Sequence, residues 1–146
     1  MRRIAQGRLA SCAGIATLLA LVLPLAACGP LDRAELKREV ESIGSLASEG
    51  ELLAAEVARD RTKTTFVRVH AGELESAAQD SAEKLNDATP GAELSDEIER
   101  AVRLASDTSD ALGQLAVSPG DEATGRSVQL ELNRLSNDAD DLSSSL

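Results

Sequence analysis

The sequence predicts an all-α protein folded as a small up-down-up-down four-helix bundle. Apolar and small residues recur at alternating spacings of four and three along four successive segments, which is the period of an amphipathic helix. No segment alternates apolar and polar residues with period two, and no β-branched cluster is long enough for a strand. The short connections between the segments favour antiparallel neighbouring helices.

The first predicted helix follows Asp32, whose side chain is suited to an N-cap, and it ends near Asp60. Gly44 and Gly50 interrupt its pattern, each at a cost of about 1 kcal/mol relative to alanine. One helix with a weakened middle and two shorter helices are therefore both compatible with this segment. Its stripe consists of Leu36, Val40, Ile43, Ala47, Gly50, Ala54 and Val57.

A turn over residues 61–64 separates this segment from the second predicted helix, for which Thr64 or Thr65 is the expected N-cap. Residues 86–91, Asn-Asp-Ala-Thr-Pro-Gly, contain several helix breakers and end it. The stripe of the second helix consists of Val67, Ala71, Leu74, Ala78, Ser81 and Leu85.

The third and fourth predicted helices are separated by a break over residues 117–121. Ser118 as N-cap, Pro119 in the first turn and Asp121 three residues after the cap are typical of a helix start. Residues 143–145 are three serines, and we expect this end to fray. The third stripe is Leu94, Ile98, Ala101, Ala105, Thr108, Leu112 and Leu115, and the fourth is Val128, Leu132, Leu135, Ala139, Leu142 and Leu146.

The predicted core lacks large side chains, because Phe66 is the only aromatic residue of the 146. Leu, Ala, Val and Ile must therefore fill it. Small side chains bury little apolar area per residue, so we expect moderate stability.

The first 27 residues have the three parts of an export signal. Arg2, Arg3 and Arg8 give a positively charged start, residues 13–27 are mainly apolar, and small residues precede Cys28. An ordinary cleaved signal and a membrane-spanning helix are the alternatives. The apolar run is short for a bilayer, which needs about 20 residues, and an ordinary cleavage site does not require a cysteine after it.

Leu25-Ala26-Ala27-Cys28 resembles the lipobox of bacterial lipoprotein precursors. The resemblance covers only the signal and Cys28. It implies cleavage before Cys28, a diacylglycerol thioether on its sulfur together with fatty acids such as palmitate, and an extracytoplasmic protein anchored to the cell membrane, or to the outer membrane of a two-membrane cell. Residues 1–27 are then the signal peptide, 28–30 the lipidated cysteine with a short tether, and 31–146 the helical domain.

The mature chain predicted in this way is strongly acidic. Cleavage removes three of the 15 basic residues and none of the 25 acidic residues, which leaves 12 against 25 and a formal charge of −13. This charge argues against nucleic acid as a partner and against adhesion to anionic lipid through a basic surface. Cys12 leaves with the signal, so no free thiol remains for a disulfide or a zinc site.

The sequence contains no recognisable catalytic or metal-binding pattern, so we expect no enzyme activity and no cofactor beyond the lipid on Cys28. His70 is the only histidine, and one histidine makes a poor metal site. We expect it to be half covered at a helix boundary, with Glu73 in reach. Asp138, Asp140 and Asp141 do not match a calcium loop, and the serines do not match a hydrolase motif.

Two functions remain. The first is a non-enzymatic helical interaction module of the cell envelope, and the alternative is a small-ligand or metal carrier that uses the bundle core. For the module, the candidate contact is a basic cluster at the turn between the first two helices, facing an envelope protein or an anionic envelope polymer. The competing interpretation is that these cations offset a helix dipole and that Asp121 and Glu122 neutralise them. The cluster consists of Arg59, Arg61, Lys63 and Arg68.

Overall fold

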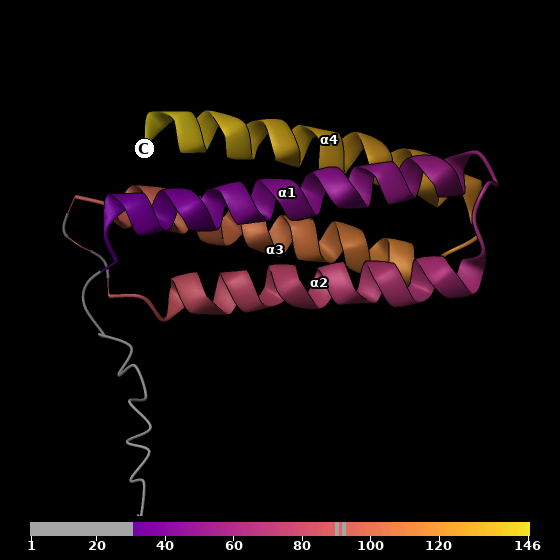
Figure 1. The fold of residues 1–146 in the computed structure, drawn as a ribbon, viewed down its shortest axis with the longest axis horizontal. Coiled ribbons are helices and arrows are strands. Elements are labelled where there is room, and N and C mark those ends of the chain that lie inside the picture. Colours follow the sequence, from indigo (N-terminus) through magenta and orange to yellow (C-terminus); the bar gives the residue numbers. More distant parts are fainter. Residues whose placement is uncertain (1–30, 90, 92) are drawn as a thin grey trace, which may run out of the picture.

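The structure is a computed structural model that describes residues 31–89, 91 and 93–146. It contains helices α1 (Arg33–Ala58), α2 (Thr64–Asn86), α3 (Ser95–Val117) and α4 (Glu122–Ser145). Each helix runs antiparallel to the one before it, which confirms the predicted up-down-up-down bundle (Figure 1). None of the helices in these ranges is long and apolar enough to cross a bilayer.

The four predicted stripes form one continuous core. Every predicted stripe residue is buried except Leu146, which is partly covered at the end of the chain. Leu53, Leu104 and Ala111 widen the core beyond the strict stripes. Aliphatic side chains therefore fill the interior among the described residues, as the composition required.

The helices do not pack evenly around the core. α1 packs most extensively against α4, and α2 against α3, whereas the α3–α4 and α1–α2 contacts are smaller. α1 and α3 also meet across the centre, while α2 and α4 do not. The cross-section is therefore a flattened rhombus with α1 and α3 on its short diagonal.

Three glycines permit the close approach of α1 to its neighbours. A Cβ on Gly44 would lie 3.0 Å from the Cβ of Ala139, and one on Gly50 would lie 2.5 Å from a methyl carbon of Leu112. A Cβ on Gly125 of α4 would lie 2.7 Å from the backbone nitrogen of Ala58. At Gly125 a methyl group would meet backbone, so glycine is required there, whereas at Gly44 and Gly50 the neighbouring side chains of Ala139, Leu112 and Leu132 would have to shift.

α1 is one continuous helix through Gly44 and Gly50, which decides between the two alternatives left by the sequence. The Asp32 side chain caps it by accepting a hydrogen bond from the Glu35 N–H at 2.7 Å, as predicted. At 26 residues, the helix is about 39 Å long at a rise of 1.5 Å per residue. Packing against α4 therefore outweighs the low helix propensity of the two glycines.

Two predicted helix starts are wrong. Thr64 is already the first residue of α2, after Lys63, and neither threonine is its cap. α4 begins at Glu122 rather than after Ser118. Its cap is Asp121, whose Oδ2 accepts hydrogen bonds from the backbone N–H of Thr124 at 2.9 Å and from its hydroxyl at 2.6 Å.

The predicted fraying at the C-terminus is also wrong, because α4 continues to Ser145. Ser143 is buried, and its carbonyl accepts a hydrogen bond from Lys37 Nζ of α1 at 2.9 Å. The Ser143 hydroxyl lies 3.3 Å from Glu41 Oε1. Contacts with α1 thus hold the last turn of α4 in place.

The connections gather at two opposite ends of the bundle (Figure 1). At one end, the Leu31 N–H donates to the carbonyl of Thr89 at 3.2 Å, which ties the start of α1 to the segment after α2. At the other end, Gly120 lies directly against the side chain of Thr64, so the α3–α4 loop adjoins the α1–α2 turn. Asp121 and Glu122 therefore begin α4 at the same end of the bundle as the basic cluster.

Leu132→Asp should lower the free energy of unfolding of the helical domain by about 3–5 kcal/mol, because it places an unpaired carboxylate in the core. Leu130→Asp is the matched control, since Leu130 lies on the same helix but is 74% exposed, against 0% for Leu132. It should change stability by less than about 0.5 kcal/mol. Urea unfolding followed by circular dichroism measures both, and similar losses would contradict the assigned core.

Gly125→Ala should destabilise the domain by about 1–3 kcal/mol, since the new methyl group would meet the backbone of α1. Gly72→Ala makes the same change in α2, where no atom of a neighbouring element lies within 4 Å of the position that the new methyl group would take. It should stabilise the domain by about 0.5–1 kcal/mol through helix propensity. Thermal unfolding compares the two, and a shared sign would refute the close approach of α1 and α4.

Candidate functional site: the α1–α2 turn

Backbone hydrogen bonds hold the α1–α2 turn in a defined conformation. The Arg61 N–H donates to the Glu56 carbonyl and the Asp60 N–H to the Val57 carbonyl, both at 3.0 Å. These are the two bonds of a Schellman motif, which needs a left-handed residue after the helix. Asp60 takes that conformation with φ of 52°, a position where glycine is more usual. The turn therefore presents its side chains from a fixed backbone.

The four predicted cations lie at this end of the bundle, three of them on or beside the turn and Arg68 on the first turns of α2. Arg59 pairs with Glu56 of its own helix at 3.4 Å. Among the described residues, Arg61, Lys63 and Arg68 form no ion pair. The structure thus brings the four cations to one end and leaves three of them available to a partner.

The expected neutralisation by the adjacent loop does not occur through direct ion pairs. Glu122 pairs with Arg126 at 3.5 Å on α4. Asp121 caps α4, and the two hydrogen bonds from Thr124 lower the pKa of its carboxyl below the usual value of 3.8. Both acids are therefore engaged within their own helix start.

Phe66 lies on the first turns of α2, beside the basic cluster. Its side chain is 55% exposed, although it is the only aromatic residue of the chain. The ring stacks on His70, with centroids 5.4 Å apart and an interplanar angle of 27°. The His70 Nε2 lies 2.9 Å from Glu49 Oε1 of α1, so a contact to α1 helps to fix the stacked pair on α2.

Two further exposed apolar residues lie about one helical turn away, Val69 from Phe66 on α2 and Leu52 from Glu49 on α1. Because His70 contacts Glu49, these two residues lie at about the same height along the axis of the bundle. On α1, Leu52 follows Glu49 by three positions, and on α2, Phe66 precedes His70 by four. Each therefore lies about one helical turn closer to the α1–α2 connection, on roughly the same helix face as Glu49 or His70 respectively. Leu52 is 70% exposed and Val69, three residues after Phe66, is 56% exposed. We call Leu52, Phe66 and Val69 the apolar patch.

The sequence prediction missed this patch. Phe66 directly precedes Val67, a residue of the predicted stripe, so Phe66 lies just outside the core. This position next to the stripe is the sequence feature that could have indicated its exposure. The proximity of Leu52 was not predictable in this way, because it depends on the register between two helices. Glu49 as a partner of His70 was missed for the same reason.

His70 occupies a half-covered position between two carboxylates, as expected for a helix-boundary residue. Its side chain is 29% exposed, and its Nδ1 lies 3.7 Å from Glu73 Oε2, the contact predicted from the sequence. Across residues 31–89, 91 and 93–146, no group of three or more His, Cys, Asp or Glu side chains is arranged to hold a metal ion.

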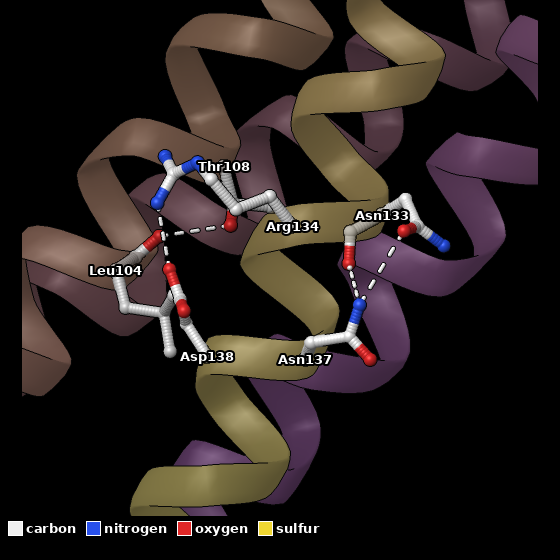
Figure 2. Close-up of polar contacts among 6 residues, drawn as sticks. All are labelled: Leu104, Thr108, Asn133, Arg134, Asn137 and Asp138. Atoms are coloured by element: carbon white, nitrogen blue, oxygen red, sulfur yellow. Dashed lines mark hydrogen bonds and ion pairs between the residues drawn. The ribbon is translucent and has the colours of Figure 1, made fainter.

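The few polar side chains of the core are satisfied locally. The buried Thr108 hydroxyl donates to the Leu104 carbonyl of its own helix at 2.8 Å (Figure 2). Outside the core, on the surface of α4 that faces α3, Arg134 pairs with Asp138 at 2.6 Å (Figure 2). Within the part of the chain that the structure describes, no buried side-chain nitrogen or oxygen lacks a hydrogen-bond partner. The core thus presents no unpaired polar group to a ligand.

Two cavities among the described residues lie in grooves between helices. A groove of about 350 Å³ between α3 and α4 is lined by both arginines and aspartates, including Arg100, Arg103 and Asp107. A second, of about 450 Å³, lies between α1 and α4 and is lined by serines and carboxylates. The charges in the first groove are balanced, and Arg103 pairs with Glu99, so it offers no net attraction for an ion.

Comparisons with protein-family models, with curated proteins and with solved structures find no match for this chain. The predicted lipidation site, Cys28, lies outside the described residues. Function is therefore inferred from the sequence of residues 1–28 and from the surface of the bundle.

Proposed function

We propose that this protein is an extracytoplasmic lipoprotein that acts as a non-enzymatic helical interaction module of the cell envelope. Cys28 carries the diacylglycerol, the tether is short, and the membrane that holds the lipid is the cell membrane, or the outer membrane where the cell has two. The partner is an envelope protein or an anionic envelope polymer. The observation that carries the proposal is the group of unpaired cations at the α1–α2 turn of an otherwise acidic chain.

The geometry of the bundle supports an outward-facing contact. α1 begins at Arg33, only five residues after Cys28, and runs without interruption to Ala58. The start of α1 and the basic cluster therefore lie at opposite ends of a helix about 39 Å long. An anchor at Cys28 would hold the cluster away from the lipid, within reach of other envelope components.

Cys28→Ser should abolish incorporation of labelled palmitate and prevent cleavage of the signal by the lipoprotein-specific peptidase, because the thioether requires a sulfur atom. Cys12→Ser is the matched control, since it removes the other cysteine of the chain and should leave both processes intact. Metabolic labelling followed by electrophoresis measures them. Label that persists on the Cys28→Ser protein would contradict the lipoprotein assignment.

Native mass spectrometry of the mature, delipidated protein distinguishes a small-ligand or metal carrier from an interaction module. The module should give the mass of the protein alone, because the polar atoms of its core are already paired. Stoichiometric retention of a small molecule or metal after purification would favour the carrier instead.

A further inference from the structure

The apolar patch and the basic cluster adjoin each other at the α1–α2 turn, and together they define one surface. Lys63 precedes α2, and Phe66 follows it by three residues, so one turn of helix separates a cation from the exposed ring. Three of the five large apolar side chains exposed among the described residues belong to this patch. Aromatic residues, Phe among them, and arginine are enriched at the centre of protein–protein interfaces.

We propose that this surface binds an acidic protein segment that inserts an apolar side chain against Phe66, with its carboxylates over Arg61 and Lys63. This inference rests on the proposed function and specifies its partner. Charge complementarity selects an acidic partner, since neither cation pairs within the described structure. Glu49 and Glu73 lie beside His70, on the side of the apolar patch away from Arg61 and Lys63. Carboxylates of a partner would therefore be attracted most strongly on the side of these two cations.

The apolar patch favours a protein over a polyanion. A phosphate or carboxylate polymer would use the cations alone and would gain nothing from burying Leu52 and Val69. An apolar anchor in a protein segment would remove all three patch residues from water, and the burial of apolar area is the main favourable contribution to protein association. Contact between two copies is disfavoured, because copies tethered to one membrane present the same cations at the same height.

The fixed position of the ring supports a preformed site. The stack on His70 and the His70–Glu49 contact hold Phe66 outside the core. The Schellman bonds hold the backbone that carries Arg61. A surface that is ordered before binding loses less entropy when a partner associates.

The test is photo-crosslinking of the full-length protein in its own cells, with a photoreactive amino acid at Leu52, at Val69 or at Leu130 as the control on α4. Positions 52 and 69 should crosslink to one protein, and mass spectrometry should place the crosslink in a segment rich in Asp and Glu with an apolar residue. Leu130 is exposed to a similar extent as Leu52 and should give no such product.

Two sets of variants separate the contributions to binding. Phe66→Ser should reduce the crosslink yield at position 52 at least about fivefold, and Arg61→Glu combined with Lys63→Glu should do the same, without a change in melting temperature. Arg100→Glu combined with Arg103→Glu is the matched control, because it makes the same charge change on exposed residues of α3, and it should retain the yield.

Each contrary result has a distinct meaning. A crosslink that is lost on charge reversal but unchanged by Phe66→Ser, or one to a polymer, would overturn the proposed protein segment. A product from position 130 alone would overturn this surface while leaving the interaction module in place. The absence of any product at the three positions, from a protein that still carries its lipid, would overturn both.

Discussion

The fold depends on the close approach of α1 to its neighbours in a core that contains no aromatic side chain. Aliphatic residues of modest size cannot fill a wide space between helices, so the helices must come together until small residues touch. A methyl group would meet the backbone of α1 at Gly125 and would displace neighbouring side chains at Gly44 and Gly50. The same glycines that weaken a helix in isolation therefore allow the tight α1–α4 contact, and burial of Ile43 and Leu132 compensates for their low propensity.

This packing leaves α1 and α2 loosely joined along their length, although a short turn connects them. Their contact includes surface interactions, among them Lys84 with Glu39 and His70 with Glu49. Surface ion pairs of this kind contribute little free energy, so they mark the register of the two helices, which core packing sets. Phe66 directly precedes the buried Val67 on α2, so packing of Val67 into the core leaves Phe66 on the outer edge of α2, beside the turn. The exposure of the one aromatic residue thus follows from how the core is built.

The stripes were predictable because burial repeats with the helical period, and this held even for polar members such as Ser81 and Thr108. Helix starts were less predictable, because more than one residue near a break can serve as a cap. Ser118 and Asp121 both suit an N-cap, but the structure uses Asp121, while residues 118–121 form a turn closed by the Asp121 N–H and the Ser118 carbonyl. The basic cluster was visible because its members are close in sequence. The apolar patch was not, because the register of two helices brings residues from α1 and α2 together.

In the proposed orientation, the charge distribution and the shape of the bundle act together. The proposed mature chain, without residues 1–27, has a formal charge of −13. An anionic membrane surface would repel it, and this repulsion would oppose a lying-down position on the membrane. An anionic membrane would attract the basic cluster, as it would Arg33 and Arg38 near the start of α1, but α1 holds the cluster at the far end from the proposed anchor. A tether of a few residues limits how far the domain can rotate towards the bilayer. With the proposed anchor at Cys28, repulsion of the body and rigidity of α1 would both keep the cations and Phe66 turned towards the envelope rather than towards the lipid.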